Sequence, residues 1–565
     1  MTQAQAAVSM SAGTREITLD VQGMTCAHCE QTVSNALQSV VGLQAVLEVS
    51  HTKAVARVNV STDTAPASVI DALTKLGYAS QIRPERQTPR TAAIISRASK
   101  EFDLAVVGGG SAGFAAGIKA AELGAQVALV EGGVLGGTCV NVGCVPSKTL
   151  IRAGEAQFRR AHHGFAGIPA SDGRPDWDAV RAQKDELVSE LRQAKYWDVL
   201  RSYETVTLLE QRAVITSGHE VRLADGRAVS AGKIIVTTGA SPWTAPIPGL
   251  AEAEYLDNAS AMALEHLPDS MIVIGGSAVG VELAQLFARL GVSVTIVEAA
   301  PRLVPAEDPD VGAALAGHLR HEGLTVHLGV EIVRVERTDG RYTVLLTHDG
   351  VTHTATAEQL LVATGRRPNT GGFGLAESGV SLGKKGEIAV NEFLQTSNSD
   401  IYAAGDVIGD PMFVYVAAYG GALAAENALT GNRRRYDLTA LPKVTFSDPG
   451  VASVGLTEQA AHERGIVPLV SNLPLEYVPR SLAARDTRGF VKLVADAATR
   501  RIIGAHILAA EAGEMITEPA LAIKYGLTIE DLASTFHPYL TLSEAIKLAA
   551  QTFDKDVAKL SCCAA

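Results

Sequence analysis

Hydrophobic and polar residues alternate along four short segments near the start of the chain, and two further segments have the period of a helix. Strict alternation is typical of half-buried strands, whereas apolar residues three and four apart line one face of a helix. In chain order we expect strands at 15–21, 43–49, 53–60 and 78–82, with helices at 27–40 and up to residue 77. This βαββαβ order predicts a small, separately folded domain over residues 1–82.

The rest of the chain changes its pattern twice. Residues 83–100 contain Pro84, Pro89 and many charges with little periodicity, which predicts a flexible linker. From residue 102 onward, apolar strands alternate with helices, the pattern of doubly wound parallel sheets. Near residue 440 the strands come first and the helices follow, so a third folding unit of α+β type is expected to begin there.

The composition excludes several classes of protein. A chain of 565 residues is long enough for about three or four domains. Acidic residues exceed basic ones by 61 − 49 = 12, which argues against a nucleic acid or an anionic membrane as the partner. Because no run of about 18 apolar residues and no basic-then-apolar leader occurs, we expect neither a membrane anchor nor a signal peptide. The expectation is a soluble, cytoplasmic enzyme.

The first candidate site is a glycine-rich turn between an apolar strand and a helix. Gly108, Gly110 and Gly113 have the GxGxxG spacing of dinucleotide-binding turns, in which glycine lets a pyrophosphate approach the helix N-terminus. Glu131 ends the next strand, where a carboxylate can bind ribose hydroxyl groups. The strand, turn, helix and acid together predict a dinucleotide site.

A second copy of this pattern follows at residues 271–298. Gly275 and Gly280 hold the outer glycine positions, Ser277 replaces the middle glycine, and Glu298 ends the next strand. A carboxylate at that place suits a free ribose 2′-hydroxyl and repels a 2′-phosphate, although Arg302 is close enough in sequence to compensate. Two dinucleotide sites in one chain suggest electron transfer between two nucleotides.

Cysteine usage points to dithiol chemistry. The six cysteines form three close pairs, Cys26/Cys29, Cys139/Cys144 and Cys562/Cys563. Such pairs in a cytosolic chain predict redox chemistry, soft-metal binding, or both.

The middle pair lies in GGTCVNVGCVPSK, residues 136–148. In an ideal helix the Cα atoms of Cys139 and Cys144 would lie about 8 to 9 Å apart, whereas a disulfide needs less than about 7 Å. The segment must therefore depart from an ideal helix if the two are to bridge, which Gly143 and Pro146 favour. A helix N-terminus and Lys148 would favour thiolate over thiol.

These motifs, with TSNSDIYAAGDV at 396–407, resemble the flavin-dependent pyridine nucleotide-disulfide oxidoreductases. The resemblance covers about residues 102–560 and implies two Rossmann-like doubly wound dinucleotide-binding domains plus an α+β dimerisation domain. It implies an FAD-binding domain at 101–245 and 370–439, an NAD(P)H-binding domain at 246–369, and a dimerisation domain with a Cys-Cys tail at 440–565. The family is homodimeric, with each active site completed by the partner.

The resemblance also assigns roles to single residues. Asp406 would meet the flavin ribitol, and Lys148 would lie near the flavin N5 atom, paired with Glu282. Cys144 would be the thiol next to the flavin and Cys139 the interchange thiol. Further positions that match flavin contacts of the family are Gly133, Thr138, Ala213 and Val414.

Two departures from the family's usual pattern bear on the substrate. Disulfide reductases of this family carry a histidine as the acid/base that protonates the thiol. In FHPYLTLSEA, residues 536–545, alignment on the threonine places Tyr539 at that position, while His537 offers a competing register. A tyrosine with an unperturbed pKa near 10 is a poor proton shuttle at neutral pH, so ordinary disulfide exchange is disfavoured.

The second departure is the tail, KLSCCAA. Adjacent cysteines close only a strained ring as a disulfide, but Cys562 and Cys563 as a dithiol suit a soft metal ion. Together with Tyr539, this tail resembles the mercuric reductases of the family. Tyr196 matches a tyrosine of their cleft.

The N-terminal unit is similar to heavy-metal-associated domains, which have a ferredoxin-like βαββαβ fold. Its GMTCAHC motif places Cys26 and Cys29 three residues apart, so that both sulfurs can bind one ion. Thiolates select soft metals, but the motif does not separate Hg(II) from Cu(I) or Zn(II).

The resemblance implies reduction of thiol-bound Hg(II) to volatile Hg(0), with electrons from NADPH or NADH passing through FAD to Cys139 and Cys144. Metal would be collected by the N-terminal pair and handed on by the C-terminal pair of the partner subunit. Glu298 favours NADH and the family resemblance NADPH. Two alternatives stay open: a dihydrolipoyl dehydrogenase-like disulfide reductase with a fused metal-binding domain, and a soft-metal binding protein whose flavoprotein part is inactive.

Overall fold

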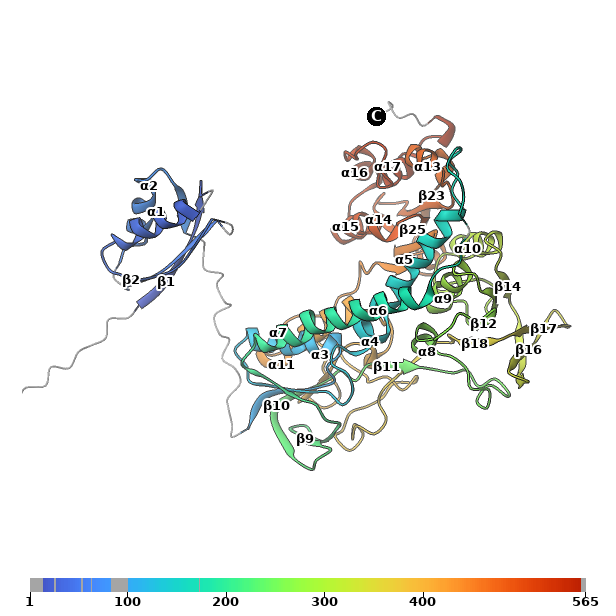
Figure 1. Ribbon diagram of the computed structural model, residues 1–565, viewed down its shortest axis with the longest axis horizontal. Helices are drawn as coiled ribbons and strands as arrows, with labels where there is room; N and C mark the ends of the chain where they lie inside the picture. The colour runs from blue at the N-terminus through green and yellow to red at the C-terminus, as the bar shows by residue number, and fades with distance from the viewer. Residues whose placement is uncertain are drawn as a thin grey trace, which may run out of the picture. The chain divides into compact units, whose positions relative to one another are not determined.

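The computed structural model of the chain describes residues 14–24, 27–51, 54–61, 64–82, 100–171 and 173–559. The chain separates into two compact units, residues 1–93 and 94–565, drawn in Figure 1. Nearly all of the predicted linker lies outside the described residues. Within the described ranges, no helix is both long and apolar enough to cross a membrane.

The smaller unit is a four-stranded antiparallel sheet covered by two helices, with the strand order β2-β3-β1-β4. Alternate residues of the first strand, such as Leu19, are fully buried and pack with Val33 and Leu37 of the first helix. The predicted βαββαβ order is therefore confirmed. Its elements are β1 (Thr14–Gln22), α1 (Ala27–Gln38), β2 (Leu43–Ser50), β3 (Val55–Ser61), α2 (Pro66–Thr74) and β4 (Ala79–Ile82).

The larger unit begins with a seven-stranded sheet whose parallel strands run in the order β7-β6-β5-β10, with β20 beside β10. The predicted alternation of strand and helix is confirmed, because VALV at residues 127–130 is buried on both faces as a central parallel strand requires. The strands of this sheet are β5 (Phe102–Val107), β6 (Val127–Val130), β7 (Val206–Leu209), β8 (Ala213–Ser217), β9 (Glu220–Leu223), β10 (Ala228–Val236) and β20 (Ile401–Ala403). Two helices, α3 (Ser111–Glu122) and α11 (Val414–Thr430), accompany it.

A helical excursion leaves this sheet between β6 and β7, and a second dinucleotide sheet follows. The second sheet is parallel in the order β14-β13-β12-β18, and a three-stranded antiparallel sheet, β15-β16-β17, lies next to it in the chain. The excursion comprises α4 (Gly137–Val142), α5 (Cys144–Ala161), α6 (Trp177–Arg192), the π-helix η1 (Gln193–Trp197) and α7 (Asp198–Arg201). The later elements are β11 (Ala240–Pro242), α8 (Asn258–Met262), β12 (Ser270–Ile274), α9 (Ala278–Arg289), β13 (Ser293–Glu298), α10 (Pro309–His321), β14 (Thr325–Leu328), β15 (Glu331–Thr338), β16 (Arg341–His348), β17 (Val351–Ala357), β18 (Gln359–Val362), β19 (Arg366–Pro368) and η2 (Asp406–Ile408).

The C-terminal part of the larger unit is a five-stranded antiparallel sheet, in the order β21-β22-β25-β24-β23, followed by helices. The change of pattern predicted near residue 440 is therefore confirmed. The elements are β21 (Lys443–Thr445), β22 (Gly450–Gly455), α12 (Glu458–Glu463), β23 (Pro468–Pro474), η3 (Leu475–Tyr477), α13 (Pro479–Ala484), β24 (Phe490–Asp496), β25 (Ile502–Ala509), α14 (Ala512–Met515), α15 (Thr517–Tyr525), α16 (Ile529–Ser534), α17 (Glu544–Gln551) and η4 (Val557–Lys559).

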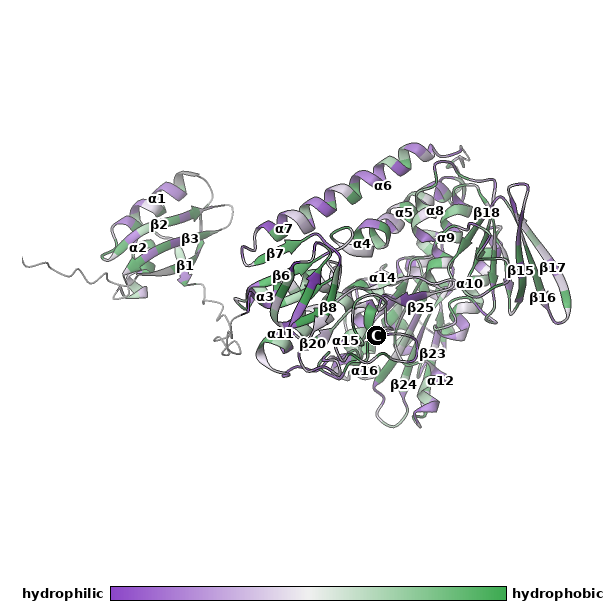
Figure 2. Cartoon of the chain, turned by 90° about the horizontal axis from the view of Figure 1, so that it is seen from below, coloured by the Kyte–Doolittle hydropathy of each residue, from purple (hydrophilic) through white to green (hydrophobic). Residues whose placement is uncertain are grey.

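Hydrophobic residues concentrate on the strands of the sheets, while α6 carries polar stretches along its length (Figure 2). The helices α3 and α11 pack against each other beside the first sheet, and α5 packs against α9 of the second nucleotide domain. These two contacts bring the ends of β5 and β20, the break between α4 and α5, and the start of α9 around one space.

Candidate functional site

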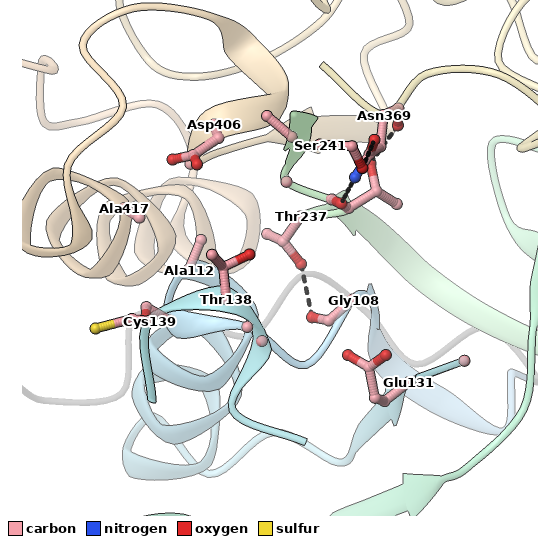
Figure 3. A pocket seen from close by; sticks show the side chains of 18 of the residues that line it. Gly108, Ala112, Glu131, Thr138, Cys139, Thr237, Ser241, Asn369, Asp406 and Ala417 are labelled. Carbon is pink, nitrogen blue, oxygen red and sulfur yellow. Dashed lines mark hydrogen bonds between the residues drawn. The ribbon is translucent and has the colours of Figure 1, made fainter. Parts of the chain in front are cut away.

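A cavity of about 1360 Å³ in the larger unit is lined mostly by the first dinucleotide domain and is bordered by α9 of the second. Its wall carries Glu131, Thr138, Cys139, Cys144, Lys148, Ala213, Glu282, Asp406 and Val414 among the predicted site residues. Figure 3 shows Asp406 on one side of this space, with Gly108, Thr138 and Glu131 on the other. The topology thus gathers residues that are hundreds of positions apart in the sequence.

The turn from β5 to α3 forms one end of the cavity. Gly108 has φ +110°, and a Cβ atom on it would lie 2.4 Å from the carbonyl oxygen of Thr237. A Cβ atom on Gly113 would lie only 1.8 Å from the carbonyl oxygen of Gly108, so the helix can approach the turn only without a side chain there. Gly110 is the N-cap of α3 and brings no side-chain cap, which leaves the first helical N–H groups for an anion.

At each of the two glycine turns, a glutamate carboxylate accepts hydrogen bonds from the main chain. Glu131 accepts hydrogen bonds from the N–H groups of Gly109 and Gly133, each at 2.6 Å. In the second domain, Glu298 accepts from the N–H groups of Gly276 and Ala300. Each acid is therefore oriented by the main chain before any ribose is bound.

The second glycine turn, like the first, leaves no room for a side chain at its outer glycine positions. Gly275 has φ +111°, and a Cβ atom on Gly280 would lie 1.9 Å from the carbonyl oxygen of Gly275. Ser277 has φ −88° and caps α9 without a side-chain hydrogen bond, so this position does not need glycine. Serine in place of the middle glycine of the motif is therefore compatible with the geometry of the turn.

The opposite wall is supplied by the segment after β20. Gly405 has φ +79°, and Asp406 begins η2 with its carboxyl group on the cavity wall. Burial raises the pKa of Asp406, against a lowering contribution from Arg366. A partly buried carboxyl group on one wall and the uncapped N–H groups of α3 on the other fit the hydroxyl and phosphate groups of FAD.

The two cavity cysteines lie on either side of a helix break. Cys139 is in α4, Cys144 begins α5, and Gly143 between them has φ −126° and ψ −115°, which no helix contains. A Cβ atom on Gly143 would lie 2.8 Å from the carbonyl oxygen of Thr138, so the break needs glycine. Both sulfurs are free thiols. The predicted departure from an ideal helix is therefore present.

The two thiols differ in acidity. A hydrogen bond from the Cys139 thiol and the nearby charge of Lys148 lower the pKa of Cys144 to about 7, although burial opposes this. The same hydrogen bond and burial raise the pKa of Cys139. Cys144 is therefore the thiol that ionises first, as expected for the thiol that the family resemblance places next to the flavin.

Lys148 lies one helical turn after Cys144 and is held from two sides. Its Nζ atom donates to Oε2 of Glu282 on α9 at 2.7 Å, and it lies 4.6 Å from the ring centroid of Phe446. The other oxygen of Glu282 accepts from the N–H group of Phe446 at 2.9 Å. The predicted pairing of Lys148 with Glu282 is present, and Phe446 is an additional member that the sequence did not reveal.

Tyr196 lies in the π-helix η1, half-buried against the start of α3. Its ring centroid is 4.7 Å from that of Phe114, and its hydroxyl group is hydrogen-bonded to Ser111. Burial raises the pKa of Tyr196, and Cys139 and Cys144 are close enough to contribute electrostatically. The tyrosine therefore lies near the thiol pair, although it is not on the wall of the cavity.

The two registers of the segment 536–545 have different surroundings. The Nε2 atom of His537 is 2.7 Å from Oε1 of Glu518, its Nδ1 atom is 3.0 Å from the carbonyl oxygen of Thr535, and its side chain is 4% exposed. Tyr539 is 55% exposed. The side chain of His537 is thus hydrogen-bonded within its own subunit, whereas the side chain of Tyr539 is exposed at the surface of the subunit.

The outer cysteine pairs fall largely outside the described residues. Cys26, Cys562 and Cys563 are not described, and Cys29 lies in the first turn of α1. In the part of the chain that the structure describes, no group of three or more histidine, cysteine, aspartate or glutamate side chains is arranged to hold a metal ion. The metal roles of these cysteines stay predictions.

Comparison with known proteins assigns all three parts of the chain. Residues 102–421 match the pyridine nucleotide-disulphide oxidoreductase model, residues 441–550 its dimerisation domain, and residues 18–79 the heavy-metal-associated domain. The mercuric reductase of Staphylococcus aureus is 42% identical over 97% of this chain and 98% of its own length. The chain belongs to the mercuric reductases of the pyridine nucleotide-disulphide oxidoreductase family.

Other relatives agree with this assignment. The mercuric reductase of Shigella flexneri is 42% identical over 97% of this chain and all of its own length, and that of Streptomyces lividans is 47% identical over 82% of this chain and 98% of its own. Among solved structures, the HOCl-induced flavoprotein disulfide reductase RclA of Escherichia coli, in a Cu(II) complex, has a TM-score of 0.72 at 28% identity, covering 80% of this chain and 99% of that one. Mercuric reductases of this family use FAD and NAD(P)H.

Two residues of the site escaped the sequence-based reasoning. Thr237 donates from its hydroxyl group to the carbonyl oxygen of Gly108 at 2.8 Å and so braces the first glycine turn, as Figure 3 shows. Phe446 lies 302 positions after Cys144 in the chain and belongs to the segment that the sequence pattern identified only as the start of a third unit. No spacing rule links either residue to the motifs, because their roles arise from contacts between strands and domains.

We expect the alkylation rate of Cys144 to rise with pH around a midpoint of about 7, rather than the ~8.5 of an unperturbed cysteine. The lowered pKa means that thiolate accumulates as pH rises through this value. Replacing Lys148 by Met removes the favourable charge and should raise the midpoint. Iodoacetamide kinetics with tandem mass spectrometry, which assigns the modified sulfur, measure this in the reduced protein. Lys119→Met, at the far end of α3, is the control, and an unchanged midpoint in Lys148→Met would contradict the electrostatic account.

Proposed function

We propose that the chain reduces thiol-bound Hg(II) to volatile Hg(0) with electrons from NAD(P)H, in mercury detoxification. The observation that carries this proposal is the pair Cys139/Cys144, one thiol acidified to a pKa of about 7, on the wall of a cavity that fits FAD. Near-full-length similarity to mercuric reductases supports the same substrate.

The chain's own residues prepare the site for this reaction. When bound, FAD supplies the two-electron connection between the nicotinamide and the thiol pair. The N-terminus of α3 and Asp406 would hold its phosphate and ribitol groups. Lys148 offers a fixed positive charge at the cavity wall, where negative charge develops during reduction.

Thiolate chemistry explains why a dithiol is needed for this substrate. Soft thiolate ligands bind soft metal ions tightly, so Hg(II) leaves one pair faster by exchange through a third thiolate than by dissociation. Cys144 as thiolate would bind first, and Cys139 would follow when its proton is lost. Two electrons then convert Hg(II) to Hg(0), which has little affinity for thiolates and leaves.

We further propose that mercury reaches this pair by a relay of dithiols. Cys26 and Cys29 would collect the ion, and Cys562 and Cys563 of the partner subunit would pass it inward, with Tyr539 and Tyr196 positioning the metal or its ligands. A homodimer is supported by the match to a dimerisation domain and by exposed apolar side chains there, including Phe536 at 98% and Tyr525 at 69% exposure. The reducing cytoplasm would keep the thiols free and supply NAD(P)H.

One observation keeps the disulfide reductase as a second candidate. The close pair of His537 and Glu518 has the composition of an acid/base dyad for thiol protonation, although it lies within one subunit. Measurable turnover of dihydrolipoamide would favour this reading.

The test of the proposal is Hg(II)-dependent oxidation of NADPH and NADH in excess small thiol, with mercury collected from the headspace. One Hg(0) released for each nucleotide oxidised is the expected result, because both steps transfer two electrons. Nucleotide oxidation without loss of mercury would contradict the proposal and indicate oxidase or disulfide chemistry.

The proposed relay predicts that loss of the two C-terminal cysteines slows the reduction of thiol-complexed Hg(II). The double substitution Cys562→Ala and Cys563→Ala should lower kcat/KM for thiol-complexed Hg(II) by about tenfold or more, because delivery then loses its local dithiol. Headspace mercury measured over a range of thiol concentrations detects this. Ser561→Ala, adjacent to the pair, is the matched control. Full turnover by the double variant would rule out the relay.

The second dinucleotide turn predicts a preference for NADH. Glu298 is fixed by two main-chain N–H groups at the ribose position, while Arg302 donates to the carbonyl oxygen of Pro305 at 3.1 Å instead of pairing with Glu298. Glu298→Ser should therefore lower the ratio of kcat/KM for NADH to that for NADPH by about tenfold. Steady-state kinetics with both nucleotides decide the question, with the exposed Glu331→Ser in the same domain as control. A strong NADPH preference in the unsubstituted protein would defeat this argument.

A further inference from the structure

The turn between β21 and β22 is held by one face of α9. Gln285 accepts from the N–H group of Asp448 at 2.8 Å and donates to its carbonyl oxygen at 2.7 Å. Arg289, one turn further along the helix, forms an ion pair with the Asp448 carboxylate at 2.9 Å. Glu282 lies one helical turn before Gln285. Three residues at helical spacing on α9 therefore bind the segment between β21 and β22. The dimerisation domain is thereby fixed to α9 of the second nucleotide domain, the helix whose Glu282 pairs with Lys148.

Phe446 is the part of this turn that faces the site. Its N–H group donates to one oxygen of Glu282, and the other oxygen of the same carboxylate accepts from Lys148. The Phe446 ring lies under the Lys148 ammonium at 4.6 Å. The ring is nevertheless 42% exposed, so it does not serve as a core residue. Its position is explained by the contacts to Lys148 and Glu282.

We propose that Phe446 is a positioning residue that fixes the Lys148 ammonium at the wall of the redox cavity. A lysine side chain has about 2 kcal/mol of rotamer freedom, and one ion pair leaves much of that freedom in place. A ring face on a second side restricts the ammonium further, because the negative face of an aromatic ring attracts a cation. The dimerisation domain thus sets the location of a charge that the first domain contributes.

The consequence concerns the field inside the cavity. A charge held in one place stabilises developing negative charge without rearranging during the reaction, whereas a mobile ammonium has to be reoriented first. Loss of the ring should therefore lower the rate of reduction more than it changes nucleotide binding. This inference does not depend on the identity of the metal, so it is separable from the proposed function.

The direct test is the rate at which an amine-reactive acetylating ester modifies Lys148 in the full-length, flavin-loaded protein, read by mass spectrometry. Phe446→Leu keeps an apolar side chain but removes the ring face. In this variant we expect Lys148 to react about two- to fivefold faster, the factor that corresponds to ~0.5–1 kcal/mol of cation–π attraction. Phe446→Tyr and Phe446→Trp keep a ring and should restore the slow rate. Lys492, which is buried against Asp308, is the internal control.

A second readout separates positioning from a general effect on folding. Phe446→Leu should lower kcat while leaving KM for the nucleotide unchanged, and Phe446→Tyr should recover kcat. An unchanged modification rate of Lys148 in Phe446→Leu would overturn the proposal. It would also be overturned if Lys492 became equally more reactive, since that pattern indicates a loosened domain. The modification rates can be read without mercury, so a failure of the proposed reaction leaves this result interpretable.

Discussion

The ion pair between Lys148 and Glu282 is the contact on which the arrangement of the site depends. It joins the thiol-bearing helix α5 of the first nucleotide domain to α9 of the second, and Glu282 continues to the main chain of the dimerisation domain at Phe446. The Glu282 side chain is 7% exposed, so breaking the pair would leave a buried charge without its partner. Three domains are therefore joined next to the thiol pair.

Around this contact, most of the remaining electrostatics comes from the main chain. The first N–H groups of α3 and α9 have no side-chain cap at the two predicted nucleotide turns, and Glu131 and Glu298 are each oriented by two N–H groups. Main-chain groups in tight turns cannot rotate freely, so the site keeps its polarity when empty. Glycine is required at these turns because a Cβ atom would overlap with a carbonyl oxygen less than 2.5 Å away, as at Gly108.

The helix break at Gly143 links local geometry to redox chemistry. It separates Cys139 from Cys144 just enough for the first thiol to donate a hydrogen bond to the second, which makes the two sulfurs unequal. One thiol with a lowered pKa and one with a raised pKa are suited to binding a soft metal ion in two steps. The same asymmetry would serve disulfide exchange, so we propose that groups outside the pair, such as Tyr539 and the C-terminal dithiol, select the substrate.

Much of this protein followed from its sequence alone. Hydrophobic periodicity predicted the βαββαβ unit, the parallel sheets and the later α+β unit, because burial on one face or on two leaves a local pattern. Glycine spacing located both nucleotide turns, since only glycine tolerates those close approaches. Phe446 and Thr237 could not be found in this way. Their contacts, to Lys148 and to Gly108, exist only after strands and domains far apart in the chain have packed together, and no local pattern records such a distance.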